Sequence, residues 1–156
     1  MRRRSLVPLV AAVLAALGVP SAFAAGTKPA EQVMPRVQYH LRHIDQLAQH
    51  FDSVLRSPCP QFTTHDEWKS YFDGEVDRVV SLWAHVEQAW VEAKQTGDDE
   101  VRRAAKAPRR RLEEARTLLD KLQNCAGDNG ASFSQMGVLR KIEREVPERQ
   151  AQITQP

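Results

Sequence analysis

Apolar residues between Thr64 and Thr96 recur every three or four positions, which is the spacing of one face of an α-helix. The repeating positions are Trp68, Phe72, Val76, Val79, Trp83, Val86 and Trp90. Further apolar residues flank both sides of this line, so the face is wider than one partner helix would cover. The pattern predicts a central helix packed on at least two others, with all of the repeating aromatic positions mostly buried.

Both ends of this helix have recognisable signals. Thr64-His65-Asp66-Glu67 fits a capping box, in which a hydroxyl and a glutamate three residues later satisfy each other's free backbone N–H groups. Gly97 follows the last apolar residues and predicts a left-handed stop. All three tryptophans of the chain lie between these signals.

A second amphipathic helix is predicted from Pro35 to Arg56. Its apolar positions are Val37, Leu41, Ile44, Ala48, Phe51 and Leu55. Pro35 suits the first helical position, where its missing N–H costs nothing. The two prolines at positions 58 and 60 forbid continuation beyond Arg56.

Two more helices complete the predicted fold. One runs from Asp99 to Cys125, and Pro108 inside it predicts a kink or a split. A shorter one runs from Ser134 to Val146 and is interrupted by Pro147. No segment alternates apolar and polar residues as a half-buried strand would. We therefore expect an all-α fold, an antiparallel up-down-up bundle of three long helices plus a shorter C-terminal fourth helix.

The N-terminus has the pattern of a secretory signal peptide. Arg2, Arg3 and Arg4 precede an apolar run from Leu6 to Val19, and Ala22-Phe23-Ala24 supplies the small residues of a cleavage site. A membrane anchor is the weaker interpretation, since the run falls short of the roughly 20 residues that span a bilayer. We expect a cleaved signal at 1–24, a flexible segment at 25–34, one domain at 35–146 and a polar tail at 147–156. The exported product would be periplasmic or secreted, without a transmembrane segment.

Removal of the signal changes the charge. The chain has 22 basic and 20 acidic residues, and three of the basic ones lie in the signal, which leaves 19 against 20 and a net charge of −1. Nucleic-acid-binding domains carry a marked positive excess, so we exclude nucleic acid as a partner.

Two cysteines in an exported protein favour a disulfide. Cys59 follows the end of the first predicted helix, and Cys125 lies at the end of the third. In an up-down-up bundle these two ends share a pole, so we expect a Cys59–Cys125 bridge. A pair of free thiols, one of them catalytic, is the weaker alternative because no redox motif or triad accompanies them.

A cluster of basic residues on the third predicted helix is the main candidate for a binding surface. Positions 101–112 contain no acid, and five cations share an arc of about 120° on a helical wheel. We call these residues the basic arc: Arg102, Arg103, Lys106, Arg109 and Arg110. The arc would attract an anionic envelope component or an acidic envelope protein, whereas the alternative is a solvated face balanced by nearby acids.

The histidines suggest a second kind of site. His40 and His43 are three residues apart on the first helix, a spacing at which two imidazoles can share a metal ion, with Met34, Asp45 or His65 as further ligands. His50 is too far along the axis to join them. The alternative is that these are partly exposed helix residues, so we assign no metal site and no cofactor.

Catalytic motifs are absent from the sequence. It contains no Gly-rich phosphate loop, no Gly-x-Ser-x-Gly and no His-Glu-x-x-His, so we assign no catalytic residue. The favoured function is that of a binding or adaptor protein of the cell envelope. The alternative is a periplasmic metal-binding or metal-sensing protein that uses the histidines of the first helix, and a small all-α enzyme is a distant third. The sequence does not determine the oligomeric state.

Overall fold

The computed structural model describes residues 27–154, and the predicted signal peptide lies outside this range. The described residues form helices and no strand, as the sequence predicts. The elements are α1 Ala30–Arg56, α2 His65–Ala93, α3 Asp99–Lys106, the 3₁₀ turn η1 Ala107–Arg110, α4 Arg111–Asp128 and α5 Gln135–Ile153. Within residues 27–154, no helix is long and apolar enough to cross a membrane.

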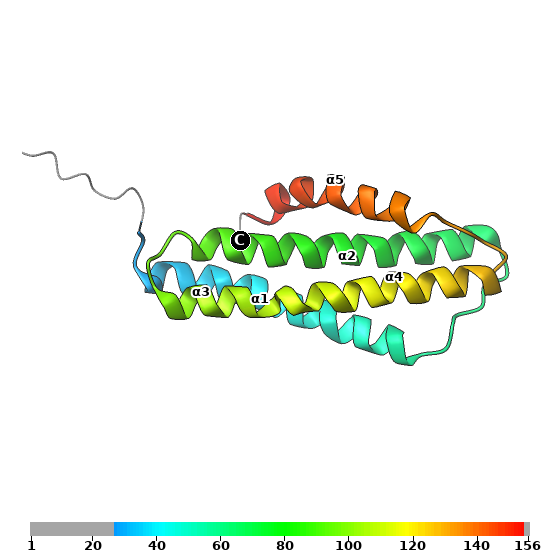
Figure 1. Cartoon of the computed structure of the whole chain (residues 1–156), viewed down its shortest axis with the longest axis horizontal. Helices are drawn as coiled ribbons and strands as arrows, with labels where there is room; N and C mark the ends of the chain where they lie inside the picture. Colours follow the sequence, from blue (N-terminus) through cyan, green and yellow to red (C-terminus); the bar gives the residue numbers. More distant parts are fainter. Residues whose placement is uncertain (1–26, 155–156) are drawn as a thin grey trace, which may run out of the picture.

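Successive long helices alternate in direction, and α2 occupies the centre of the bundle (Figure 1). It packs against α1, α3, α4 and α5. The last helix, α5, lies mainly on α2 and runs parallel to it, while α4 lies against α1 and α2. We call the end of the bundle that holds the two cysteines the disulfide pole, and the opposite end the α3 pole.

The predicted disulfide is present at the disulfide pole. Cys59 and Cys125 are joined with an S–S distance of 2.02 Å and a Cα–Cα distance of 5.3 Å. Polar contacts reinforce this link, because the Lys121 ammonium of α4 donates to the carbonyl oxygens of Val54 at 2.7 Å and Leu55 at 3.1 Å, near the end of α1. The up-down-up order predicted from the cysteine positions is confirmed.

The N-terminal signal of α2 is confirmed and its C-terminal signal is not. The Glu67 backbone N–H donates to Thr64 Oγ1 at 3.2 Å, and the Thr64 N–H donates to Glu67 Oε2 at 3.0 Å. The prediction that Gly97 forms a left-handed stop is wrong: α2 ends at Ala93, and Gly130 alone among the described glycines has a positive φ, of 63°. Lys94 takes the C-cap in a right-handed helical conformation, so no glycine is needed.

The first helix begins five residues earlier than predicted. The sequence places its start at Pro35 and expects a flexible segment over 25–34, yet α1 starts at Ala30. Val33 accounts for the extension, because it is buried between α2 and α3 with 1% of its surface exposed. Burial of this side chain offsets the one helix hydrogen bond that Pro35 cannot make.

The two internal prolines of the later helices behave differently. Pro108 splits the third helix as predicted, since the chain passes through η1 between α3 and α4. Pro147 does not end the last helix, and α5 continues to Ile153 where the sequence predicted a polar tail over 147–156. Contacts beyond Pro147 explain this: Ile153 packs on the core, and Arg149 donates to Ser81 Oγ at 2.9 Å.

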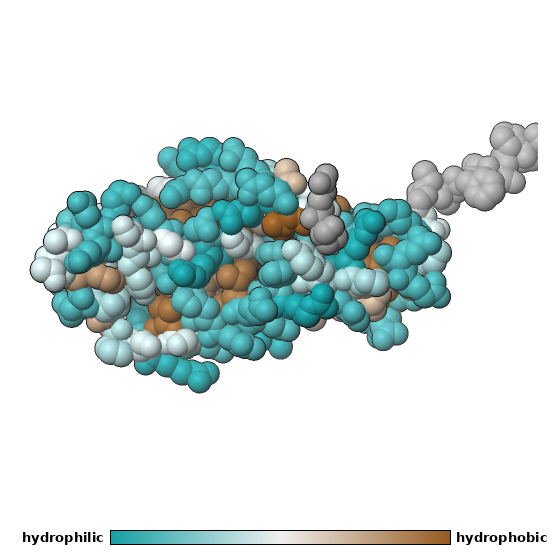
Figure 2. All heavy atoms as spheres, turned by 180° about the vertical axis from the view of Figure 1, so that it is seen from behind, coloured by the Kyte–Doolittle hydropathy of each residue, from teal (hydrophilic) through white to brown (hydrophobic). Residues whose placement is uncertain are grey.

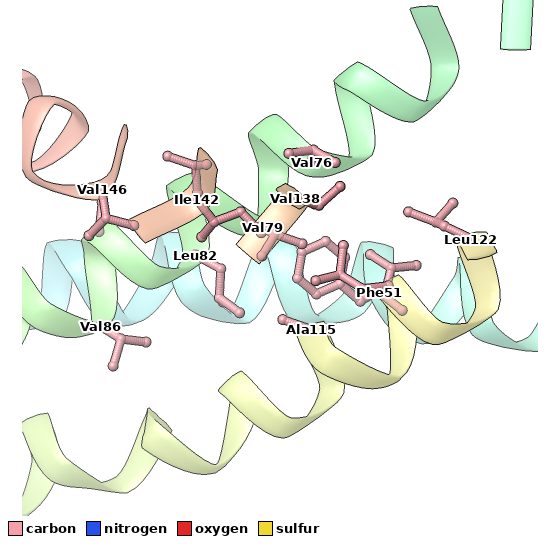
Figure 3. Close-up of a cluster of buried hydrophobic side chains, with 14 of the residues drawn as sticks. Phe51, Val76, Val79, Leu82, Val86, Ala115, Leu122, Val138, Ile142 and Val146 are labelled. Carbon is pink, nitrogen blue, oxygen red and sulfur yellow. The ribbon is translucent and has the colours of Figure 1, made fainter. Parts of the chain in front are cut away.

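The hydrophobic core consists of two clusters. The larger one fills the middle of the bundle and the disulfide pole, where side chains from α1, α2, α4 and α5 meet (Figure 3). The smaller one lies at the α3 pole and contains mostly small residues: Val33, Val37, Ala89, Ala93, Val101 and Ala105.

The core line of α2 is rotated from the predicted one. Trp68, Val79 and Val86 are buried as expected, whereas Phe72, Trp83 and Trp90 are only half-buried. Leu82, which lies beside the predicted line, is completely buried, as are Ala89 and Ala93. The centre of the buried face is formed largely by smaller side chains, whereas the rings of Phe72, Trp83 and Trp90 lie at its edges. On α5, Met136 is 59% exposed, whereas Val138 and Ile142 are buried.

Candidate functional site

The basic arc lies at the α3 pole, on α3 and η1. Arg102 is half-buried, and the other four cations are exposed. Two of the guanidinium groups are oriented by backbone oxygens, since Arg102 Nε donates to the Thr96 carbonyl at 2.9 Å and Arg103 Nε to the Asp99 carbonyl at 3.3 Å. These contacts hold the side chains without neutralising their charge.

Within residues 27–154, no cation of the arc has a carboxylate oxygen within the 4.0 Å of an ion pair. The neighbouring arginines differ: Arg111 pairs with Glu114, and Arg116 pairs with Glu113 at 2.8 Å. Glu113 and Glu114 are the first acids after the arc along the chain, and both are paired with arginines outside the arc. The positive charge of the arc is therefore concentrated.

The indole of Trp90 lies at the centre of this charge. The Lys106 ammonium is 5.7 Å from the ring centroid, the Arg109 guanidinium is 5.5 Å away, and Lys94 from the end of α2 is 5.9 Å away. Cations at such distances are attracted to the ring, by about 0.5–1 kcal/mol each at exposed sites. This attraction explains how three like charges gather over one side chain.

An open hollow of about 490 Å³ adjoins the indole. It is lined by Trp90, Asp99, Arg102, Arg103 and Lys106. Three cations and an aromatic surface therefore face the same space, with one carboxylate on its rim. The sequence pattern identifies the cations but not Trp90, which lies on the predicted apolar line of α2 and was therefore expected in the core. Nothing in that spacing indicates that α3 leaves the indole half-covered.

A second feature is a cluster of three histidines between α1 and α2. His40 is 2% exposed, and its Nδ1 lies 2.9 Å from Nδ1 of His85. The His43 ring stacks on His85, with ring centroids 4.7 Å apart and an angle of 12° between the planes. The predicted pair, His40 and His43, is thus brought together through His85, a residue that the sequence analysis did not select.

Burial favours the neutral form of two of these histidines, His40 and His85, because it lowers the pKa of each. Burial lowers the pKa of His85 to about 4, and repulsion from His40, His43 and Arg149 acts in the same direction. Burial also lowers the pKa of His40, although the Glu92 carboxylate opposes this effect. A single shared proton between the two Nδ1 atoms satisfies the His40–His85 contact, which two protonated rings would break.

His50, which its spacing in the sequence placed too far along the helix to share an ion with His43, has a different partner. It donates through Nε2 to both carboxylate oxygens of Glu75, at 3.1 and 2.9 Å. Across residues 27–154, no three His, Cys, Asp or Glu side chains are placed as a ready set of metal ligands. The observation that still supports metal binding is one pair of facing nitrogens, Nδ1 of His40 and Nδ1 of His85.

Two buried glutamates on α2 were missed by the sequence analysis. Glu75 is 2% exposed and also accepts from Arg78 Nη1 at 3.0 Å. Glu92 is 3% exposed and accepts from Gln88 at 3.1 Å and Gln95 at 3.0 Å. Since a buried carboxylate is stable only with such partners, these contacts give both residues a structural explanation.

Comparison with known proteins adds no functional assignment. No protein-family model, curated protein or solved structure matches this chain.

Proposed function

We propose that this protein is an exported binding protein of the cell envelope, which uses the basic arc to hold an anionic component of that compartment. One observation carries the proposal: four cations of the arc, Arg102, Arg103, Lys106 and Arg109, border the half-buried Trp90 or the hollow beside it, and none of them has an ion pair among the described residues. Export is supported by the signal-like N-terminus and by the Cys59–Cys125 disulfide, a bond typical of oxidising compartments.

The concentration of charge is the physical basis of the proposal. Like charges on one short helix repel each other, so the arc is a feature that folding alone does not favour. A binding partner of opposite charge relieves this repulsion and is attracted over a distance of about one Debye length, about 8 Å at physiological salt. The mature chain has a net charge near zero, so the attraction would be local to the α3 pole.

The proposal is tested by charge reversal on the arc. The variant Arg103→Glu, Lys106→Glu and Arg110→Glu is compared with the parent for retention of components from an envelope extract. We expect the parent to retain a component at low salt and to release it at high salt, and we expect the variant to lose it.

A matched control carries the same change of net charge elsewhere. Arg42, Arg140 and Arg144 are exposed cations outside the arc, and their reversal to Glu should leave retention unchanged. Circular dichroism verifies that both variants stay folded. Equal retention by the parent and the arc variant at low salt would show that the arc is a solvated face and does not bind the component.

Metal binding is a second candidate function, favoured by the contact between His40 and His85. Two nitrogens 2.9 Å apart, each about 2.0–2.1 Å from a metal, would subtend an angle of about 90° at the ion. This angle suits square-planar or octahedral ions better than tetrahedral Zn²⁺. Calorimetric titration with Cu²⁺ and Ni²⁺ tests the idea: binding should disappear in His85→Gln and persist in His65→Gln, whereas no heat of binding in the parent contradicts it.

A further inference from the structure

The hollow over Trp90 has features that suit a particular class of anion. Arg102 and Arg103 present guanidinium groups, whose forked donors match phosphate oxygens, and Lys106 adds a third positive charge on the same hollow. Its volume of about 490 Å³ lies within the range of small-ligand sites. The indole beneath provides a flat surface for the organic part of a phosphate ester.

The surroundings of the arc do not resemble a protein-binding surface. Stable protein interfaces have an apolar centre surrounded by polar residues. Among the described residues, the exposed large hydrophobic side chains are Val91, at 41%, and Met136, at 59%. Met136 lies at the start of α5, near the disulfide pole. On the side of the molecule opposite to that in Figure 1, hydrophobic residues form separate spots among hydrophilic ones (Figure 2).

The same features suit the surface of an anionic bilayer. Such a surface presents many phosphates in a plane, so it needs no apolar centre on the protein and attracts each nearby Lys or Arg independently. Tryptophan favours the headgroup level of a membrane, where its ring is partly apolar and partly wet. Val91, the next residue of α2, adds an exposed apolar side chain at the same pole of the molecule.

We infer that the basic arc and the Trp90 hollow bind the phosphate-bearing headgroups of an anionic lipid bilayer, so that the α3 pole docks on a membrane surface. This inference rests on the proposed function, because it names the anionic component that the arc holds. Binding is peripheral: phosphates contact Arg102, Arg103 and Lys106, and the indole meets the headgroup layer.

Vesicle cosedimentation and fluorescence of the exported protein test this inference. The probes are vesicles of phosphatidylcholine with about one third phosphatidylglycerol, and vesicles of phosphatidylcholine alone. At about 50 mM salt we expect binding to the anionic vesicles only, with a blue shift of tryptophan emission. The shift should be absent in Trp90→Phe, which keeps Trp68 and Trp83. Because each cation near an anionic surface contributes about a fivefold increase in binding, the arc reversal should weaken partitioning by at least about 100-fold.

The Arg42, Arg140 and Arg144 reversal again serves as the control, and it should bind the anionic vesicles like the parent. Loss of binding in this control equal to that of the arc variant would overturn the inference, because net charge alone would explain it. A Trp90 emission change with glycerol phosphate or inorganic phosphate, but not with vesicles, would overturn the membrane as the source of phosphate.

The two proposals fail in different ways. If the parent ignores anionic vesicles but still retains an envelope component through the arc, the lipid inference is overturned and the proposed function stands. If the arc variant also retains that component, both proposals are contradicted.

Discussion

The two poles of this bundle are built differently. At the disulfide pole, large side chains fill the core, and a covalent bond joins the segment after α1 to α4. Lys121 of α4 also donates to backbone carbonyls near the end of α1. At the α3 pole, the core is a small cluster of valines and alanines, and Pro108 breaks the third helix. The cations on this surface have no ion pair within residues 27–154. The comparison indicates that stability is concentrated at one end and the candidate binding surface at the other.

Removal of the disulfide should have the largest effect on stability. The double variant Cys59→Ser and Cys125→Ser releases a loop closed by residues 66 apart, for which the loop-entropy model gives about 4 kcal/mol. Thermal unfolding should shift down by about 10 °C or more. A loss of less than about 1 kcal/mol would show that the non-covalent contacts of this pole, including Lys121, are sufficient to hold it.

Acid should destabilise the boundary between the two poles, where the histidine cluster lies. The pKa of His85 is about 4 in the folded protein against 6.5 for a free histidine, so the unfolded chain binds more protons between these values. The stability contribution is complete above pH 6.5 and is lost as the pH falls toward 4, with a full size of about 3 kcal/mol. Urea unfolding across this range should show a shallower pH dependence for His85→Gln than for the parent. An unchanged pH dependence in His85→Gln, or the same reduction in the His65→Gln control, would contradict the assignment to His85.

Matched truncations in the two core clusters compare the poles directly. Leu119→Ala in α4 should cost about 2–3 kcal/mol, because it leaves a cavity in the densely filled cluster. Val101→Ala in α3 should cost about 1–1.5 kcal/mol, since it removes less apolar volume from a cluster of small residues. Both positions are 1% exposed, so exposure does not explain the difference. If both variants lost the same free energy of unfolding in denaturant, the two core clusters would not differ in their contribution to stability.

Charge reversal on the arc should have the smallest effect on stability. The variant Arg103→Glu, Lys106→Glu and Arg110→Glu should stay within about 0.5 kcal/mol of the parent, because these side chains are exposed and make no ion pair among the described residues. Added salt should stabilise the parent more than this variant, since salt screens repulsion that only the parent has. A large loss of stability would mean that the cations hold the fold together.

Sequence patterns predicted the parts of the fold that depend on local chemistry. The capping box at Thr64, the break at Pro108 and the pairing of Cys59 with Cys125 each follow from residue type and position in a helix. The predicted start of α1 and the predicted end of α5 were wrong. Val33 and Ile153 gain tertiary contacts, and these outweigh the helix-breaking effect of a nearby proline. Periodicity shows which residues are apolar, but not how far a neighbouring helix covers them.

The candidate site was predictable to a similar extent. The five cations of the arc stand out in the sequence because no acid separates them, but Trp90 joins them only through the packing of α3 against α2. His85 was missed for the same reason, because its partner is 45 residues away in α1. Buried polar residues such as Glu75 look like surface residues until their hydrogen-bond partners are placed.

The central position of α2 has a consequence for how the whole protein unfolds. Every other described helix packs on α2, and both core clusters include its side chains. If either pole unfolded while α2 stayed intact, the apolar face of α2 would be exposed to water. If one end of α2 unfolded, the core cluster at that end would be exposed in the same way. The helix therefore makes the two dissimilar poles one cooperative unit, in which damage at either end appears as a single calorimetric transition at a lower temperature.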